Sequence, residues 1–382
     1  KDQLENKPFL VYGFGKSGKA CFNYLKKKNN IKILDDNILY KESKYRNYYI
    51  SKNNIYDHSF NYIIISPGIN IKKCSISKYL NKNKHKIINE LDIFYIKNKK
   101  NLKITITGTN GKSTTSKLIY EVLKKHRKDV RLTGNIGSPL LNEKRISSKT
   151  IFVIEASSYQ IEYSKYFKSK FAIILNISPD HLERHKTMKN YVKAKFKIIK
   201  RQSENDYALI EYKNKYLNNE IRNNKIKSKI IEVKYNYNKM LKKVKNNYFF
   251  NINNLNNLNF VIYLSKILKL KLNKVFEVVE KFKGLDYRQQ LIYKNKKYLI
   301  INDSKSTSFS SSINLLKSYQ NIYWIVGGQY KKGDRFILEK KFYNQIKGYI
   351  YGKNKNFFVK NFKNKIQIKN FNQILDCLKQ IQ

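Results

Sequence analysis

One stretch in the first third of the chain joins three patterns that together leave few possible folds. Residues 104–107 are mostly β-branched and predict a buried strand, and residues 113–123 repeat apolar positions with helical spacing. Gly108 and Gly111 lie between them, so the backbone can form a tight loop whose N–H groups converge on an anion. A strand, a glycine loop and a helix in this order predict an α/β fold with phosphate bound at the helix N-terminus.

The side chains of this loop favour a nucleoside-triphosphate site. Lys112 supplies a cation for the outer phosphates, and the Ser113 hydroxyl is placed to hold Mg²⁺. Ile106 stands where the strict Gly-x-x-x-x-Gly-Lys-Ser/Thr pattern has its first glycine, so only the shorter Gly-x-x-Gly-Lys-Ser form is present. A glycine turn with a chance lysine is the alternative, and the flanking strand and helix argue against it. The residues expected to contact the triphosphate are Gly108, Thr109, Asn110, Gly111, Lys112, Ser113 and Thr114.

Length and charge bound the class of protein. The 382 residues suffice for two or three domains, each with its own core. The net charge of +52 is spread along the whole chain together with abundant Asn, Ile, Tyr and Phe, which indicates AT-rich coding bias rather than a nucleic-acid partner. The three cysteines lack metal-ligand spacing, and no apolar run approaches membrane-spanning length. We therefore expect a cytoplasmic protein with free thiols, no nucleic-acid partner and no membrane insertion.

The first segment contains a second glycine loop. A strand at 9–12 runs into Gly-x-Gly-x-x-Gly at 13–18, a helix follows, and a strand at 31–34 ends at two aspartates. A further buried strand, which begins at Tyr62, ends in a Ser-Pro-Gly loop at the same sheet edge. NAD would fit this edge, but so would a nucleotide-diphosphate group, and the second phosphate loop downstream makes a dehydrogenase less natural. The candidate ligand-binding residues are Gly15, Lys16, Ser17, Asp35, Asp36, Ser66 and Gly68.

Polar side chains follow the buried strands of the central segment. Asn135 lies in a glycine loop that could bring it near the phosphates as a ligand-binding residue. Glu155 ends one apolar strand, and Asp180 and His181 follow another. Because the carboxyl ends of parallel strands meet at one edge of a sheet, Glu155 is placed to bind magnesium beside the phosphate loop. A solvated glutamate at a strand end is an equally good interpretation from the residues alone. Two of the five histidines, His181 and His185, fall in one turn, which lifts that turn above a chance surface histidine.

Several motifs of this segment resemble those of the Mur ligase family. They are Gly108-Thr-Asn-Gly-Lys-Ser-Thr-Thr115, Gly134-Asn-Ile-Gly137, Glu155-Ala-Ser-Ser-Tyr-Gln160 and Asn176-Ile-Ser-Pro-Asp-His-Leu-Glu-Arg-His185, continued by Tyr191-Val-Lys-Ala-Lys195. The resemblance implies that Ser113 and Glu155 serve a first magnesium, and that His181 and Lys195 serve a second. It also implies that Lys195 is carbamylated; without the resemblance it would be an ordinary helix-surface lysine.

The last segment matches further family motifs, with departures. Asn253-Asn-Leu-Asn-Asn257 resembles His-Asn-x-x-Asn, Gly284-Leu-Asp-Tyr-Arg288 resembles Gly-Leu-x-His-Arg, and Asn302-Asp-Ser-Lys-Ser-Thr307 resembles Asn-Asp-Ser-Lys-Ala-Thr. From the pattern, we expect a strand at 298–301 and a helix that opens within 302–307. The resemblance implies that Asn254 and Asn257 approach the adenine and that Arg288 reaches the ATP phosphates on domain closure. It assigns the incoming amino acid to Lys305, Thr307 and Lys331.

These patterns predict three α/β domains. Residues 1–97 would form a Rossmann-like domain for a UDP-linked substrate, 98–283 a P-loop ATPase domain with a mostly parallel sheet, and 284–382 an incomplete Rossmann-like domain. The segment 84–101 shows no core-like strand, and we place the first boundary there. The chain stops where a family member would have a further portion and begins without Met, so we expect a truncated record.

Within the family, Ser157-Ser-Tyr-Gln160 and Asn302-Asp-Ser-Lys305 favour the branch that adds D-glutamate to UDP-N-acetylmuramoyl-L-alanine through an acyl phosphate. The resemblance implies ATP and two Mg²⁺ ions as cofactors, and we expect a monomer. A sister ligase for another amino acid, an NAD dehydrogenase, a basic nucleic-acid binder and a degenerate ligase that binds nucleotide without turnover are the alternatives. Phosphate release that depends on D-glutamate would distinguish the D-glutamate-adding ligase from all four alternatives.

Overall fold

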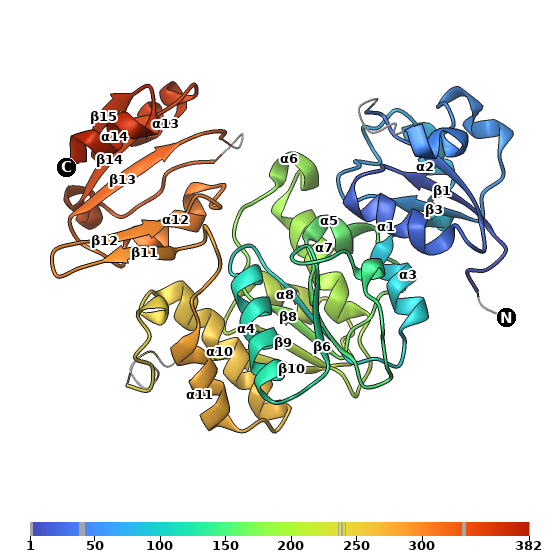
Figure 1. The fold of residues 1–382 in the computed structure, drawn as a ribbon, viewed down its shortest axis with the longest axis horizontal. Helices are drawn as coiled ribbons and strands as arrows, with labels where there is room; N and C mark the ends of the chain where they lie inside the picture. Colours follow the sequence, from blue (N-terminus) through green and yellow to red (C-terminus); the bar gives the residue numbers. More distant parts are fainter. Residues whose placement is uncertain are drawn as a thin grey trace. The chain divides into compact units, whose positions relative to one another are not determined.

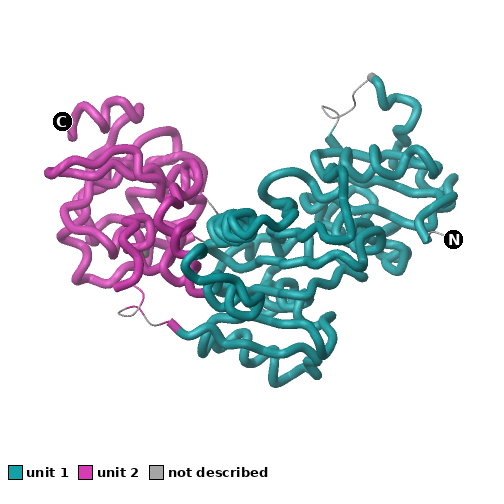
Figure 2. The backbone as a smooth tube through the Cα atoms, turned by 60° about the horizontal axis from the view of Figure 1, so that its bottom comes forward, with its two compact units in different colours: residues 1–234, 260–275 teal, residues 235–259, 276–382 magenta. Residues whose placement is uncertain are grey.

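The computed structural model divides into two compact units (Figure 2). The first comprises residues 1–234 and 260–275, and the second comprises residues 235–259 and 276–382. The structure describes residues 3–37, 43–235, 237, 240, 242–330 and 334–381. The domain boundaries expected near residues 97 and 283 stay predictions.

A four-stranded parallel sheet forms the N-terminal part of the first unit (Figure 1). In sheet order, its strands are β2 (Asn30–Leu34), β1 (Pro8–Tyr12), β3 (Tyr62–Ile65) and β4 (Ile87–Ile88). Its helices are α1 (Lys16–Leu25), α2 (Ser77–Lys82) and α3 (Glu90–Lys97). Alternate residues of the strands enter two separate apolar clusters, with Val11 and Ile64 in one and Leu10 and Ile63 in the other, as in a sheet covered on both faces. The expectation that 84–101 lacks a core strand is wrong, because buried β4 pairs with β3.

A six-stranded parallel sheet forms the central part of the first unit (Figure 1). In sheet order, the strands are β10 (Lys229–Val233), β9 (Tyr207–Glu211), β8 (Phe171–Ile174), β5 (Lys103–Thr107), β7 (Ile151–Glu155) and β6 (Val130–Gly134). The helices are α4 (Lys112–Lys125), α5 (Ser158–Tyr163), α6 (Leu182–His185), α7 (Met188–Lys200) and α8 (Lys215–Arg222). From β5 the chain builds the sheet first through β6 and β7 on one side and then through β8 to β10 on the other. Ligands bind at the carboxyl ends of strands beside such a reversal.

The remaining elements are two helices and two smaller sheets. The helices are α10 (Ile252–Ile267) and α11 (Leu272–Lys281). The antiparallel pair β11 (Gln290–Lys294) and β12 (Leu299–Asn302) precedes α12 (Phe309–Leu316). The parallel sheet of β13 (Ile322–Gly327), β14 (Ile346–Tyr351) and β15 (Gln367–Phe371) carries α13 (Lys355–Phe362) and α14 (Ile374–Ile381). The predicted α/β class with mostly parallel sheets is confirmed.

The helix expected to open within 302–307 begins only at Phe309, so that prediction is wrong. The Asp303 carboxylate accepts hydrogen bonds from the backbone N–H of Gln289 at 3.1 Å and from the Ser306 hydroxyl at 2.6 Å. These bonds hold the segment as a turn against the start of β11, and they occupy the Asp303 carboxylate, which therefore does not cap a helix. None of the helices within the described ranges combines the length and the hydrophobicity that crossing a membrane requires.

A buried carboxylate joins α3, which follows the four-stranded sheet, to the loop between α5 and β8 of the six-stranded sheet. Asp92 is 0% exposed and lies in the first turn of α3. It accepts hydrogen bonds of 2.7–3.0 Å from one hydroxyl and three consecutive backbone N–H groups, those of Ser164, Lys165, Tyr166 and Phe167. Each of these donors would lose its partner together with the carboxylate.

We predict that Asp92→Ala lowers the free energy of unfolding by roughly 3 kcal/mol, because buried N–H groups without an acceptor cost about 1–3 kcal/mol each. Asp92→Asn should cost less, since its amide oxygen still accepts. The midpoint of urea denaturation measures both effects, with Asp57→Ala at an exposed position as the control. Equal midpoints for the Asp92 and Asp57 variants would contradict the structural role of Asp92.

Candidate active site

The loop between β5 and α4 has the backbone that anion binding requires. Gly111 precedes α4 with φ +81°, in the left-handed region that glycine adopts without strain. The loop is fastened to the end of β8, because the N–H of Thr109 donates to Asn176 O at 3.0 Å and that of Asn110 to Asn176 Oδ1 at 2.8 Å. The positive end of the α4 dipole therefore meets a loop of fixed shape.

Two lysine side chains converge on one carbonyl group of this loop. Lys112 Nζ donates to the carbonyl oxygens of Gly108 and Thr109, both at 2.8 Å. Lys195 Nζ, from α7, donates to the same Gly108 oxygen at 2.7 Å. Lys195 is 1% exposed, so it is not a surface lysine as its residue type suggests. Burial, followed by the charge of Lys112, lowers the pKa of Lys195 well below its ordinary value.

Glu155 ends β7, which pairs with β5 beside the phosphate loop. Its Oε1 accepts a hydrogen bond from Asn135 Nδ2 at 2.7 Å, and its buried Oε2 has no hydrogen-bond partner among the described residues. Gly134 permits this approach, because a Cβ there would lie 2.3 Å from Glu155 O and its φ is +109°. A buried carboxylate oxygen without a donor costs free energy unless a cation occupies its place, so Glu155 fits a metal ligand.

The turn after β8 places His181 beside α5. The Tyr159 hydroxyl lies 2.9 Å from His181 Nδ1 and donates to Glu183 Oε1 at 3.2 Å. On the other side of the ring, His181 Nε2 lies 3.3 Å from Asp180 Oδ2. Burial raises the pKa of Tyr159, so the phenol keeps its proton for the bond to Glu183. Such a contact at Nδ1 makes Nε2 the ring nitrogen suited to a metal.

The available donors suit a hard cation with oxygen ligands. Within the described ranges, no three His, Cys, Asp or Glu side chains gather into a metal site. Ser113, at the start of α4 and 6% exposed, offers a hydroxyl, and Glu155 offers the carboxylate oxygen without a partner. These two residues fit magnesium. His181 and Lys195 would fit a second ion only with an added anionic group, such as a carbamate, on the lysine.

Sequence reasoning missed the residues that hold these groups in place. Asn176 fastens the phosphate loop, Tyr159 contacts His181, and the Tyr191 hydroxyl lies 3.1 Å from Thr109 Oγ1. All three lie inside the motifs that resemble the Mur ligase family. Their positions in those motifs were the only signal, because no local pattern reveals contacts with residues so distant in the chain.

The first glycine loop and the loop after β3 are bonded to each other. The Ser66 hydroxyl donates to Gly13 O at 2.6 Å, and Asp35 Oδ2 accepts from the N–H of Phe14 at 2.5 Å. Gly15 and Lys16 begin α1 directly after this loop, with Lys16 exposed. Gly68 lies in the loop after β3 and is exposed. The structure therefore brings five predicted ligand residues, Gly15, Lys16, Asp35, Ser66 and Gly68, to one edge of the sheet.

Two other predicted ligand-binding residues of this edge, Ser17 and Asp36, form hydrogen bonds with side chains of the same chain. The Ser17 hydroxyl donates to Glu90 Oε2 at 2.5 Å, and burial raises the pKa of Glu90. Asp36 accepts hydrogen bonds from the Tyr12 hydroxyl at 2.6 Å and from the Ser75 hydroxyl. Their roles in ligand binding stay predictions.

The last segment contains the residues expected to bind ATP and the incoming amino acid, and these residues lie in the second unit. Arg288, Lys305 and Thr307 are exposed, and the Lys305 N–H donates to Tyr287 O at 3.0 Å, so the two motifs adjoin. Asn254 and Asn257 are 4% exposed. Their approach to the phosphate loop of the first unit stays a prediction, and Lys331 lies outside the described residues.

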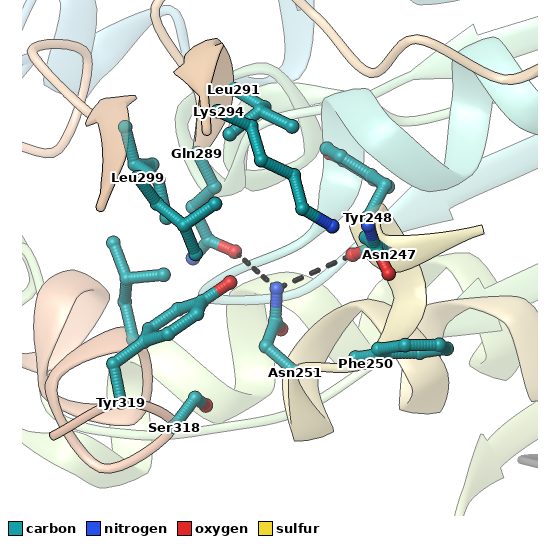
Figure 3. Close-up of a pocket in the computed structure, with 12 residues that line it drawn as sticks. Asn247, Tyr248, Phe250, Asn251, Gln289, Leu291, Lys294, Leu299, Ser318 and Tyr319 are labelled. Carbon is teal, nitrogen blue, oxygen red and sulfur yellow. Dashed lines mark hydrogen bonds between the residues drawn. The ribbon is translucent and has the colours of Figure 1, made fainter. Parts of the chain in front are cut away.

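A pocket of about 240 Å³ opens in the second unit (Figure 3). Asn251 Nδ2 donates to Gln289 Oε1 at 2.9 Å in this pocket (Figure 3). Asn254 Nδ2, which does not line the pocket, donates to the same oxygen at 3.3 Å. The pocket also has the Lys294 amine and the Tyr319 hydroxyl on its wall. Gln289, the residue after Arg288, is thus bonded to Asn254 of the asparagine motif.

Comparison with solved structures supports this architecture. MurF from Thermotoga maritima in complex with ADP matches with a TM-score of 0.58 at 16% identity, over 99% of this chain and 88% of that one. The UDP-N-acetylmuramate-alanine ligase MurC of the same organism matches with a TM-score of 0.55 at 16% identity, over 98% and 92%. At such identity the likeness shows the fold alone.

Sequence comparison gives closer relatives. The Mur ligase middle domain matches residues 106–274. The UDP-N-acetylmuramoylalanine--D-glutamate ligase of Rickettsia bellii is 32% identical over 395 residues, which cover 97% of this chain and 86% of that protein. The protein of the same name from Caldicellulosiruptor bescii is 31% identical, over 87% and 79%. Identity of this level over most of both chains means that the chain belongs to the Mur ligase family.

Proposed function

We propose that the protein is an ATP-dependent ligase that joins D-glutamate to UDP-N-acetylmuramoyl-L-alanine in peptidoglycan precursor synthesis. Relatives named UDP-N-acetylmuramoylalanine--D-glutamate ligase, 32% and 31% identical over most of this chain, support this activity. The observation that carries it is the convergence of Lys112, Lys195 and Glu155 on a loop beside the reversal of strand order. Such a loop suits a triphosphate together with a divalent cation.

The reaction explains why positive charge must gather there. An oxygen of the alanyl carboxylate attacks the γ-phosphorus of ATP, the bond to ADP breaks, and an acyl phosphate forms. The amine nitrogen of D-glutamate then attacks the carbonyl carbon, phosphate leaves, and one proton is released. A carboxylate and a triphosphate repel each other, so cationic groups and loop N–H dipoles must offset the charge as they approach. Magnesium, when bound, adds positive charge at the phosphates.

The side chains of this site divide the work. Lys112 and the loop from Gly108 to Thr114 hold the outer phosphates, and Ser113 and Glu155 hold one magnesium. His181 and Lys195 hold a second, and Asn135 orients Glu155 through its 2.7 Å hydrogen bond. The other binding roles follow the sequence prediction. The UDP group goes to Gly15, Lys16, Ser17, Asp35, Asp36, Ser66 and Gly68; the nucleotide of ATP to Asn254, Asn257 and Arg288; and D-glutamate to Lys305, Thr307 and Lys331.

A carbamate on Lys195 would resolve the electrostatics of this site. A neutral lysine nitrogen can attack the carbon of CO₂ and lose a proton, which converts a potential cation into an anion with two oxygen atoms. Burial beside Lys112 favours that neutral amine, as the lowered pKa of Lys195 indicates. The resulting anion would offset the charge of Lys112 and would supply the oxygen atoms that a second magnesium needs. We further propose that the enzyme acts in the cytoplasm as a monomer.

Phosphate release by the purified protein tests the proposed function. With ATP, Mg²⁺ and UDP-N-acetylmuramoyl-L-alanine, D-glutamate should support turnover, whereas L-alanine and diaminopimelate should not. Lys112→Ala should lower kcat/KM by roughly 10²–10³-fold, because a fixed charge at the developing negative charge is lost. Lys117→Ala is the matched control, since Lys117 lies on the same helix and forms a surface ion pair with Glu121.

Three outcomes would count against this assignment. Turnover with diaminopimelate instead of D-glutamate would indicate a sister ligase. Nucleotide binding without phosphate release would indicate a degenerate ligase. A Lys112→Ala variant as active as Lys117→Ala would reject the phosphate-loop assignment.

We predict that ¹³C-bicarbonate gives the wild-type protein a carbamate carbon signal in its NMR spectrum, and that Lys195→Met abolishes it. The signal should fade as the pH falls through the lowered pKa of Lys195, because the protonated amine cannot attack CO₂. Lys193→Met, at an exposed position two residues away, should keep the signal. An unchanged signal in Lys195→Met would place the modification elsewhere.

A further inference from the structure

Arg184 lies between the two parallel sheets of the first unit. It belongs to α6, directly after His181, and its side chain is 7% exposed. Its guanidinium group donates to Ile69 O at 2.5 Å and, more weakly, to Gly68 O at 3.4 Å. Both carbonyl groups belong to the loop after β3, which is 115 residues away in the sequence.

Side chains of α5 hold this guanidinium group in one orientation. Arg184 Cζ lies 5.0 Å from the ring centroid of Tyr159 and 5.4 Å from that of Tyr163. The Tyr163 hydroxyl accepts a hydrogen bond at 3.1 Å and Glu162 Oε2 one at 3.4 Å. A planar guanidinium can stack on rings and donate in its own plane at once, which a lysine ammonium cannot do.

The contacts of Arg184 belong to a continuous series that links two loops. On one side, Ser66 in the loop after β3 donates to Gly13 O at 2.6 Å, in the first glycine loop. On the other side, the Tyr159 hydroxyl lies 2.9 Å from His181 Nδ1, and the Arg184 N–H donates to His181 O at 3.1 Å. Arg184, together with the Tyr163 hydroxyl that accepts from the N–H of Ile71 at 3.4 Å, therefore links the edge that would bind UDP to the turn that would bind metal.

A structural role alone does not account for this choice of partners. Glu162, on the neighbouring helix, would suffice to pair the charge, yet the shortest bond of Arg184 goes to the backbone carbonyl of Ile69 in the loop after β3. A hydrogen bond to a main-chain group fixes the position of the loop itself and not merely of a side chain.

We propose that Arg184 is a positioning residue that fixes the loop after β3 relative to His181. This inference depends on the proposed function, in which one end of the substrate binds at the first glycine loop and the alanyl carboxylate reacts at the phosphate loop. A substrate held at both ends reacts only if the two loops keep their spacing. A displacement of about 1 Å at the reacting atoms can cost about 10²-fold in rate.

The test is Arg184→Lys, which keeps the charge and removes the planar fork. We expect kcat/KM for UDP-N-acetylmuramoyl-L-alanine to fall about 10–100-fold. The Kd of UDP alone, from calorimetry, and the KM of ATP should change by less than about twofold, because both loops still bind their ligands. The control is Arg201→Lys, since Arg201 also donates to a backbone carbonyl, Ser164 O, but does not contact the loop after β3.

Hydrogen exchange provides a readout that needs no activity. In Arg184→Lys, the amides of residues 69–71 and 181–185 should exchange at least about tenfold faster than in wild type. The hydrogen bonds of the Arg184 guanidinium group, which we call the clamp, must break when these segments open in wild type, and the variant lacks them. Arg201→Lys should leave both segments unchanged. Tyr163→Phe removes the hydroxyl that accepts from Arg184 at 3.1 Å and from the N–H of Ile71 at 3.4 Å, so it should also speed exchange at residues 69–71.

The outcomes separate this inference from the proposed function. Wild-type exchange in Arg184→Lys, or unchanged kcat/KM, would overturn the positioning role. A matching loss of UDP affinity would also overturn it, because Arg184 would then act in binding. A wild-type protein that shows no turnover with D-glutamate would reject the proposed function, and the exchange rates would still decide whether the clamp exists.

Discussion

Two lysine amines donate to a single backbone carbonyl of the phosphate loop, that of Gly108. The chemistry of the first unit depends on the closeness of these two amines. Lys112 and Lys195 both donate to that oxygen, and Lys195 is almost completely buried. Two like charges so close in a site shielded from water raise the free energy of the doubly protonated state. The arrangement is relieved by deprotonation of Lys195, by the carboxylate of Glu155 or by bound anions. The fold thus prepares a place that favours negative charge before any ligand arrives.

The parallel sheet brings these groups together from distant parts of the chain. Neighbouring strands β7, β5 and β8 all end at the same edge, which places Glu155, the phosphate loop and the turn around His181 side by side. Small residues are needed where these ends meet. Gly134 has no room for a Cβ against Glu155 O, and this contact lets Asn135 reach the glutamate carboxylate. The site is therefore a consequence of strand order as much as of the residues themselves.

The phosphate loop and the strand ends were predictable because their signals are local. Glycines between an apolar strand and an amphipathic helix allow few backbone paths, and polar residues after apolar strands lie at one sheet edge. Without the family resemblance, Lys195 would be interpreted as a surface residue from its type alone, although it occupies the buried face of α7 with Tyr191, Ile198 and Ile199. Its place in an apolar stripe was a signal in the sequence. No such signal exists for Arg184, because the carbonyl groups to which it donates lie in the loop after β3, 115 residues away in the sequence.

Composition alone does not explain the buried lysines, and their surroundings show how a structural lysine differs from a reactive one. Lys103 is 2% exposed and donates to three carbonyl groups, those of Asn98, Lys99 and Asn101, which match its three N–H donors. Burial lowers the pKa of Lys103 to about 8, and its role is to satisfy the end of α3. Lys195 is equally buried, but its close acceptor is one carbonyl shared with another cation, and the Thr107 hydroxyl is 3.5 Å away. A buried amine with a full set of acceptors has no need of a ligand, whereas one that shares its acceptor with a second ammonium group is stabilised by reacting or by binding an anion.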